Sequence, residues 1–397
     1  MTVIYKNLKE WFLVAILAFS AFIMGTAEFT PVGLLPEISE AIGRTEADTG
    51  VLLTYYAWAV ALLSLPLTLL VSKVDRKKLI VIVLCIFSVG NLLVGFSTTF
   101  SQILFSRIIV AVSHAIYWSI MAPMAARVAP EGKGPQAVAL ISAGSSLSGV
   151  IGIPFCTFIG HKMGWHSAFF IISFFGVLSV LILGYMLPKM PSQNSGNIKG
   201  LTKLFKNKAL MNAYLMVVLF VTGNFLTYTY IVPFLNKITL LNDDAVVSML
   251  FVFGLAGLFG VLMAAKLVVK NMIGLILYGL LAVAVCLFSL RLFGSNVIIM
   301  TFLLVIWSIF AGVVYPSMAN WIMKLAPKDR DTAMSIYSAL FNVGIGAGAF
   351  FGGLAIKKMG VQNIGFVGGI LVLAGAYFVS IYVMKRKNKQ MWKIKFK

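Results

Sequence analysis

Long apolar runs, separated by short polar clusters, follow one another from residue 11 to residue 384. A helix needs about 20 predominantly apolar residues to cross a bilayer, and these runs reach that length repeatedly. They lack the strict two-residue alternation of barrel strands and are too long to be single strands. We therefore predict twelve membrane-spanning helices, over residues 11–36, 48–72, 79–97, 100–126, 135–160, 166–187, 209–235, 245–268, 271–290, 296–323, 332–356 and 361–384.

The composition agrees with this pattern. Hydrophobic residues make up 60% of the 397, charged residues only 11%, and the mean hydropathy is +0.98. A soluble domain carries roughly a quarter of its residues as charges. The sequence thus predicts an all-α polytopic membrane protein. The first run continues past Glu28 to Leu35, which is too long for a cleaved signal peptide, so we expect a retained helix.

The three cysteines fall in three different predicted spans, at Cys85, Cys156 and Cys286. One cysteine per helix favours small apolar packing groups over a disulfide framework or a metal site. We expect no bound metal.

Basic residues are distributed unevenly in this chain, which has a net charge of +20. With the N-terminus placed inside, 25 of the 32 Lys and Arg fall on the inner side, six fall on the outer side, and Arg107 lies within a span. This positive-inside pattern predicts that both termini are cytoplasmic, with the basic tail against anionic lipid headgroups. Because topology explains the charge, we expect no nucleic-acid partner.

The longest hydrophilic stretch, Pro188 to Lys208, separates six predicted spans from six. Its Pro, Ser, Gly and Asn content predicts a flexible linker that ends in a short basic amphipathic segment. We expect an N-terminal six-helix bundle over 1–188, a cytoplasmic linker over 189–208, a C-terminal six-helix bundle over 209–384 and a basic cytoplasmic tail over 385–397.

The two halves also resemble each other. At an offset of 196 residues, the fifth and eleventh spans match without a gap at Ala137/Ala333, Ser142/Ser338, Ala143/Ala339, Gly152/Gly348, Phe155/Phe351, Lys162/Lys358, Met163/Met359 and Gly164/Gly360. Just upstream, an offset of 197 matches Met121/Met318, Ala122/Ala319, Ala129/Ala326 and Pro130/Pro327. Two parallel six-helix repeats are typical of secondary transporters with a central site.

No Walker-type phosphate loop is present in the sequence, and no large soluble segment could hold ATP. We therefore expect no cofactor, and an ion gradient as the source of energy. The sequence also shows no paired carboxylates, His/Cys cluster or nucleophile–base motif, so we expect no enzyme activity. A passive channel would more naturally consist of symmetric subunits around a pore.

Five stretches carry a family resemblance: TAEFTPVGLLPEI (26–38), TYYAWAVALLSLPLTLLVSKVDRKKL (54–79), SRIIVAVSHAIYWSIMAPMAARVAPEGK (106–133), GIPFCTFIGHKMGWHSAFF (152–170) and FNVGIGAGAFFGG (341–353). They resemble the major facilitator superfamily in its twelve-helix drug:proton antiporter branch. Within that branch the chain is most similar to bacterial sugar efflux transporters of the SotB type. The resemblance covers essentially the whole chain.

The loop between the second and third spans departs from the superfamily pattern G-x-L-x-D-R-x-G-R-R/K. Thr68, Ser72 and Asp75 replace its first glycine, its aspartate and its second glycine, whereas Arg76 and Lys77 fit. The resemblance implies a gating or structural role for Arg76 and Lys77. The missing aspartate puts the usual charge network of this loop in doubt.

Glu28 is the one acidic residue that we place within a span, and Arg107 lies at a similar depth in the fourth span. A carboxylate in hydrocarbon costs at least about 2–3 kcal/mol on insertion scales, so it is by default a candidate functional group. We predict proton coupling by Glu28 with Arg107 as its partner. A permanent structural ion pair, or Glu28 facing water, is the alternative. Pro31 and Pro36 fit a kinked, polar gate.

Candidate substrate-binding residues share helical faces. In the fourth span, Arg107, His114, Trp118 and Met121 recur at helical spacing, and in the seventh Asn224 and Tyr228 are four residues apart. Thr26 and Asn320 are further candidates, as are the TYYAW stretch (54–58), Trp307 and Tyr315. The alternatives are interhelical hydrogen bonds and packing. We expect Gly152 and Pro154 to allow close helix contact and bending.

We therefore predict a proton-coupled antiporter that exports small sugars, such as arabinose, or sugar-like solutes. The alternative is a drug or nucleoside efflux antiporter of the same fold. The expected partners are the small-molecule substrate, protons and membrane lipid, and we expect a monomer in the bacterial inner membrane.

Overall fold

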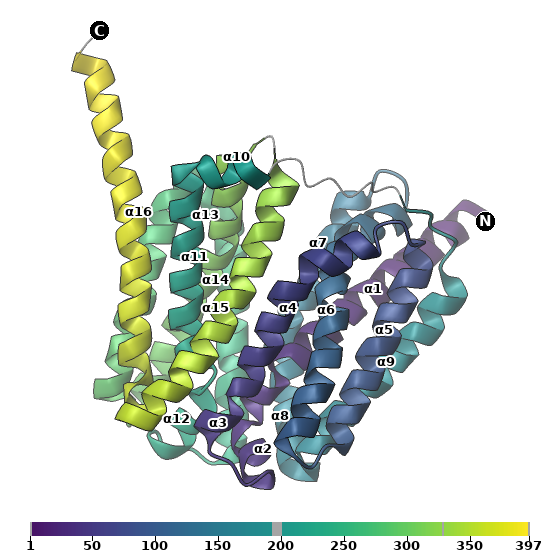
Figure 1. Ribbon diagram of the computed structural model, residues 1–397, viewed down its shortest axis with the longest axis horizontal. Coiled ribbons are helices and arrows are strands. Elements are labelled where there is room, and N and C mark those ends of the chain that lie inside the picture. The colour runs from purple at the N-terminus through teal and green to yellow at the C-terminus, as the bar shows by residue number, and fades with distance from the viewer. Residues whose placement is uncertain (1, 193–200, 328, 396–397) are drawn as a thin grey trace. The chain divides into compact units, whose positions relative to one another are not determined.

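The computed structural model describes residues 2–192, 201–327 and 329–395, in which every regular element is a helix (Figure 1). Contacts divide the chain into unit 1, Met1–Asn197 with Asp243–Phe251, and unit 2, Ile198–Asn242 with Val252–Lys397. The helices up to the linker are α1 (Thr2–Gly33), α2 (Leu35–Ala41), α3 (Glu46–Thr49), α4 (Val51–Leu70), α5 (Arg76–Phe96), α6 (Phe100–Val128), α7 (Gly134–Leu147), η1 (Ser148–Gly152), α8 (Ile153–Met163) and α9 (Trp165–Met186). Those after it are α10 (Leu201–Lys206), α11 (Lys208–Tyr228), α12 (Ile231–Lys237), α13 (Asp243–Phe293), α14 (Val297–Leu325), α15 (Arg330–Met359), η2 (Val361–Asn363) and α16 (Ile364–Lys395).

Twelve helical stretches in the described residues are long and apolar enough to cross a membrane, which confirms the predicted number of spans. The eighth and ninth spans, Asp243–Leu267 and Met272–Phe293, both belong to the single helical element α13. The helix therefore continues through the connection that we predicted between the two spans. Part of the predicted linker, 193–200, lies outside the described residues.

Three of the spans are interrupted where the sequence carries proline or glycine. In the first span, α1 ends at Gly33 and α2 starts at Leu35, with Pro36 in its first turn. In the fifth, the π-helical turn η1 separates α7 from α8, and Pro154 lies in the first turn of α8. Such π-turns commonly mark functional or bent positions in a helix. In the seventh, α11 ends at Tyr228 and α12 starts at Ile231, with Pro233 inside it.

The backbone repeats the internal similarity of the sequence. Leu34, at the break of the first span, has φ −117° and ψ 21°, and Tyr230, 196 residues later at the break of the seventh span, has φ −112° and ψ 22°. Gly164 and Gly360, at the same offset, end the fifth and eleventh spans with φ +84° and +82°. A side chain is strained at such positive φ, so glycine is favoured at both positions. The two halves therefore repeat not only residues but also helix breaks.

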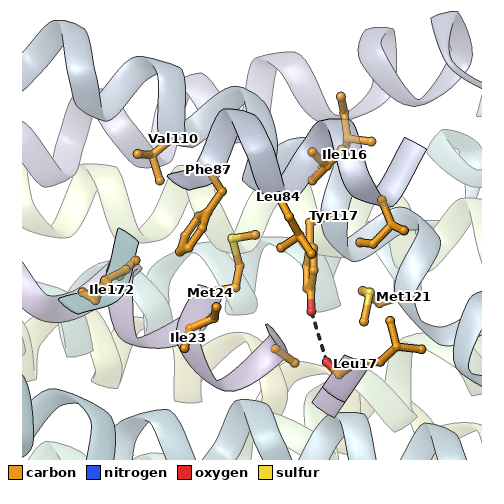
Figure 2. Close-up of a cluster of buried hydrophobic side chains, with 14 of the residues drawn as sticks. Leu17, Ile23, Met24, Leu84, Phe87, Val110, Ile116, Tyr117, Met121 and Ile172 are labelled. Atoms are coloured by element: carbon orange, nitrogen blue, oxygen red, sulfur yellow. Dashed lines mark hydrogen bonds between the residues drawn. The ribbon is translucent and has the colours of Figure 1, made fainter. Parts of the chain in front are cut away.

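The apolar interior of unit 1 lies between α1, α5, α6 and α9. Figure 2 shows Leu84 and Phe87 of α5 facing Ile23 and Met24 of α1, with Ile172 of α9 beside them. Tyr117 of α6 extends into this cluster, and its hydroxyl bonds with Ser20 Oγ at 2.6 Å. The buried hydroxyl is thereby paired inside an otherwise apolar layer.

In unit 2, α11 lies beside both α15 and α16 (Figure 1). Two tyrosines of this part of the chain donate hydrogen bonds to backbone carbonyls of α15: Tyr214 to Ala333 and Tyr230 to Ala349, each at 2.8 Å. These bonds tie the seventh span and its break to the eleventh.

Glycines permit close approach of α1 to the fifth span. A Cβ at Gly144 would overlap the backbone of Ala18, whereas a Cβ at Gly149 would meet nothing within 4 Å. We predict that Gly144→Ala destabilises the protein by roughly 1–3 kcal/mol, because two backbones must separate. Gly149→Ala is the matched control and should leave stability unchanged or slightly raised. Melting midpoints in detergent measure both, and equal midpoints would contradict this account of the crossing.

The loop between α4 and α5 is held by hydrogen bonds to the residues that follow α9. Asp75 caps α5 by accepting from the Lys78 N–H at 3.1 Å, and it also accepts from the Met190 N–H at 2.8 Å. Arg76 donates to Ser72 O at 3.1 Å and to Ser192 Oγ at 3.0 Å. In place of the superfamily aspartate, a carboxylate three positions later organises this loop, so the first residues of the predicted flexible linker are hydrogen-bonded.

Burial alone would raise the pKa of the Asp75 carboxyl, but the backbone N–H groups of Lys78, Met190 and Lys77 outweigh it and lower that pKa. Because the folded pKa is depressed, the stabilisation is present above the unfolded value of about 3.9 and is lost as pH falls through the folded value. We predict that Asp75→Ala lowers the free energy of unfolding near neutral pH by about 1 kcal/mol, the usual cost of a lost helix cap, and therefore lowers the melting midpoint. The difference from wild type should shrink below about pH 4; a difference that stays constant with pH would contradict it.

Candidate functional site

The backbone of α1 next to Glu28 carries a carbonyl that its own helix cannot satisfy. Pro31 has no N–H, so it cannot donate to the carbonyl of Ala27, four residues earlier. Arg107 of α6 takes this place, donating from Nη1 to Ala27 O at 2.7 Å and from Nη2 to Glu28 O at 3.0 Å. Arg107 as a whole is 1% exposed. Arg107 thus completes the proline-interrupted helix from the side, which answers how α1 tolerates Pro31.

The partner of the Glu28 side chain differs from the one that the sequence predicts. Glu28 is 8% exposed, and its Oε2 lies 3.7 Å from Nε2 of His114. Within the described part of the chain, no ion pair joins the carboxylate of Glu28 to Arg107, because the guanidinium is turned to the backbone carbonyls of α1. Arg107 still lies near enough to act on Glu28 electrostatically. The contacts therefore run from the Arg107 guanidinium to the α1 backbone, and from the Glu28 carboxylate to His114.

His114, which is 3% exposed, is held at both ring nitrogens. The indole N–H of Trp118, one turn further along α6, donates to His114 Nε2 at 2.8 Å. Nδ1 lies 2.9 Å from the hydroxyl of Tyr56 in α4. The Tyr56 ring in turn lies under the guanidinium of Arg107, 3.9 Å from its carbon to the ring centroid. Three helices of unit 1 thus contribute to one buried polar network.

A second buried polar network lies in unit 2, around Asn224 of α11. Its side-chain oxygen accepts from the indole N–H of Trp307 at 2.8 Å, and its amide nitrogen donates to the hydroxyl of Tyr315 at 2.9 Å. Tyr228, one turn on from Asn224, stacks on Phe253 with ring centroids 5.2 Å apart. Aromatic faces with a polar group among them suit a ligand that has both flat apolar surface and hydrogen-bonding groups.

The internal repeat relates these two networks. Asn224 is 196 residues from Glu28, the offset that relates the two helix breaks. Tyr315 is 197 residues from Trp118, the offset found in the fourth and tenth spans. In unit 1, Glu28 of the first span lies beside His114 of the fourth, which bonds with Trp118. In unit 2, Asn224 of the seventh span bonds directly with Trp307 and Tyr315 of the tenth. The equivalent position is ionisable in unit 1 and neutral in unit 2.

The remaining predicted residues do not join these networks. Thr26 donates to Phe22 O of its own helix at 2.8 Å, and a Cβ at Gly152 would overlap its hydroxyl, so this pair forms a helix crossing. Asn320 donates to Pro316 O, four residues back in its own helix, at 2.9 Å. Pro36 and Pro154 start helical segments after the breaks, and Lys77 follows Arg76 in the first turn of α5. Roles in binding or gating for these residues stay predictions.

Two features were missed by sequence reasoning. Tyr56 was one of five residues in a candidate stretch, and nothing in that stretch marks it as the partner of a histidine 58 residues away. His161 of α8 pairs with Glu37 of α2 at 2.7 Å, and its side chain is 2% exposed. The sequence signal available for this contact was an acidic residue, Glu37, just after the first span and a basic pair, His161 and Lys162, at the end of the fifth.

Comparison with known proteins gives consistent matches along the chain. The family model of the Major Facilitator Superfamily matches residues 17–329 and 269–397. Two proteins of Helicobacter pylori strains, each called a probable sugar efflux transporter, are 37% and 36% identical to this chain over 391 and 390 residues. Each alignment covers 98% of this chain and 100% of the relative.

Solved structures resemble the fold with little sequence identity. A bacterial homologue of the human lysosomal transporter Spinster, in an inward-facing and occupied conformation, matches with a TM-score of 0.76 at 16% identity, covering 94% of this chain and 96% of that one. The nucleoside transporter NupG matches with a TM-score of 0.75 at 14% identity, covering 94% and 99%. These likenesses concern the fold alone.

Proposed function

We propose that this chain, which belongs to the major facilitator superfamily, is a proton-coupled antiporter that exports small sugars or sugar-like solutes. Its fold and relatives are those of multi-pass membrane transporters and not of enzymes. The sugar substrate rests on one observation: relatives called probable sugar efflux transporters are 36–37% identical over 98% of the chain. The positive-inside pattern supports a bacterial inner-membrane protein with cytoplasmic termini, and we take the monomer as its working unit.

Proton coupling is supported by the buried network of unit 1. Glu28 combines burial with an adjacent imidazole at 3.7 Å, and such an intramembrane carboxyl is by default a functional group. Arg107 holds α1 at the point where Pro31 interrupts it, so a change in the charge of Glu28 acts on a helix that is already broken. No cofactor is needed, because the proton gradient supplies the free energy.

Substrate binding is supported by the network of unit 2. Asn224, at the position equivalent to Glu28, offers an amide that accepts from the Trp307 indole, donates to the Tyr315 hydroxyl and carries no charge to titrate. We propose a division of work in which the first span carries the proton and the seventh contributes to the sugar site. Hydrogen-bonding groups beside aromatic faces are what a sugar requires.

Counterflow in proteoliposomes tests the substrate class. Vesicles loaded with unlabelled L-arabinose should take up external labelled arabinose, and equal loading with a nucleoside or an amphiphilic drug should not drive this uptake. Empty liposomes are the control. Uptake driven by the nucleoside or drug, and not by arabinose, would contradict the sugar proposal and leave the transporter fold standing.

The alternative substrate class, drugs or nucleosides, is favoured by the aromatic content of unit 2. Tyr228 stacks on Phe253, whose ring meets that of Trp307 edge-on with centroids 5.1 Å apart. The ring centroids of Phe341 and Tyr315 are 5.4 Å apart. Flat ring systems would stack in such surroundings. The same counterflow measurement separates the two classes.

Truncation of Asn224 is predicted to weaken sugar binding. Asn224→Ala leaves the Trp307 indole and the Tyr315 hydroxyl without the partner that orients them. If the misplaced groups and the missing amide lose about 1–2 kcal/mol of contact with the sugar, KM for transport rises roughly 5–30-fold. Asn91→Ala is the matched control, because that buried amide donates to Phe87 O of its own helix and has no predicted part in binding. Equal effects of the two substitutions would contradict a role for Asn224 in binding.

A further inference from the structure

The hydrogen bonds of His114 determine which of its nitrogens carries the proton. A neutral imidazole has one N–H, and an indole N–H can only donate. Because Trp118 donates to Nε2 at 2.8 Å, Nε2 presents its lone pair, and the ring proton lies on Nδ1. Nδ1–H then donates to the hydroxyl oxygen of Tyr56 at 2.9 Å. His114 is therefore assigned as the neutral, Nδ1-protonated tautomer.

In this tautomer the nitrogen near Glu28, Nε2, carries the only acceptor lone pair of the ring, and the indole N–H of Trp118 occupies it. Nε2 is the ring nitrogen that lies 3.7 Å from Glu28 Oε2, and it is the only one of the two with acceptor capacity. A proton arriving on Nε2 would set N–H against the N–H of Trp118, two donors at 2.8 Å. As long as the indole stays in place, the carboxyl cannot pass its proton to the imidazole.

The charged and titratable groups around His114 come from three helices. Glu28 faces it from α1 and Tyr56 faces it from α4. Arg107 lies about two turns before it on α6, with its guanidinium over the Tyr56 ring. The guanidinium of Arg107 disfavours a second positive charge, and the carboxylate of Glu28 favours it. A charged imidazole is therefore stabilised only when Glu28 has lost its proton, which joins the two events.

We propose that Trp118 is a latch on this proton transfer, and that a substrate hydroxyl releases it by accepting the indole N–H. This inference rests on the proposed proton coupling and adds the step that links it to sugar. Trp118 is only partly buried, whereas His114 and Glu28 are buried, so the indole is the member of the network that a ligand reaches first.

The step itself is a simple proton transfer. When the indole N–H turns to a sugar oxygen, the O–H bond of the protonated Glu28 breaks and an N–H bond forms at Nε2 of His114. A carboxylate and an imidazolium result, and no other reactant is needed. The two side chains must approach from 3.7 Å to hydrogen-bond distance, and the proposal assigns this movement to the Glu28 side chain, because Tyr56 still holds the imidazole at Nδ1.

Nitrogen-15 spectra of histidine-labelled protein in lipid nanodiscs test the latch. The His114 signal is assigned by its absence from His114→Gln. Wild type should show the Nδ1-protonated ring, and Trp118→Phe, which keeps a flat ring but loses the N–H, should shift the ratio of ring forms about fivefold toward an Nε2-protonated or charged ring. Tyr117→Phe is the matched control, because its hydroxyl bonds with Ser20 and not with His114. An Nε2-protonated wild type, or a ratio unchanged in Trp118→Phe, overturns the proposal.

Two further arms separate this inference from the proposed function. In protein that exchanges arabinose, saturating arabinose should change the His114 signal as Trp118→Phe does; an unchanged signal overturns release by sugar. Trp118→Phe liposomes should leak protons without sugar, and the leak should vanish when Glu28→Gln is added. If Glu28→Gln still accumulates sugar normally, the proposed coupling fails, while the spectra still decide the hydrogen bond.

Discussion

Proteoliposomes that contain Glu28→Gln are expected to exchange arabinose freely and to lose all accumulation driven by a proton gradient. Glutamine keeps the size and hydrogen-bonding capacity of the side chain but cannot release a proton. A gradient of about one pH unit supports roughly tenfold accumulation at one proton per sugar, so the accumulation ratio should fall from about ten to one. Labelled arabinose measured at steady state, with and without the gradient, gives the ratio.

Glu40→Gln is the control for this substitution. Glu40 lies on α2 in the same unit and is exposed, so neutralising it makes the same chemical change outside the buried network. It should leave both exchange and accumulation at wild-type levels. If Glu28→Gln also accumulates arabinose, Glu28 is a structural charge and the proton site lies elsewhere.

Removing the guanidinium of Arg107 is expected to lower the yield of folded protein strongly. In Arg107→Met, the carbonyl of Ala27 loses the donor that replaces the missing N–H of Pro31, and a buried unsatisfied group costs about 1–3 kcal/mol. That cost is a sizeable part of the 5–15 kcal/mol that typically stabilises a folded protein. We expect the monodisperse fraction after detergent extraction to fall at least tenfold, with a lower melting midpoint in what remains.

A second substitution distinguishes this explanation from a simple loss of charge. Pro31→Ala restores a backbone N–H that can donate to Ala27 O, so it should partly rescue the stability of Arg107→Met while giving little benefit in wild type. The two substitutions therefore should not be additive in a double-mutant cycle. Additive effects on the melting midpoint would contradict the link between Pro31 and Arg107.

Hydropathy was enough to predict the twelve spans, because a bilayer requires every backbone group to be paired within a helix. The helix breaks at Leu34 and Tyr230 coincide with the internal repeat, which residue identities had indicated only in the fifth, fourth, tenth and eleventh spans. Spans eight and nine show the limit, since α13 is assigned through the predicted connection.

The site was predictable as far as helical spacing reaches. His114 with Trp118 and Asn224 with Tyr228 each share a face at four residues' spacing, and the first of these pairs is hydrogen-bonded. The expected pairing of Arg107 with the Glu28 carboxylate was not found. The rule that proline frees the carbonyl four residues earlier would have pointed to Ala27 as the acceptor. Contacts between distant helices, such as Tyr56 with His114, have no local signal.

The central claim is that sugar movement in one direction drives protons in the other. The most direct measurement follows the pH inside wild-type proteoliposomes, with a trapped dye and no imposed gradient, when arabinose is added outside. Sugar entering must then expel protons, so the interior should become more alkaline, and a protonophore should abolish the change. Labelled arabinose that enters with no change in internal pH, or with acidification, would contradict antiport.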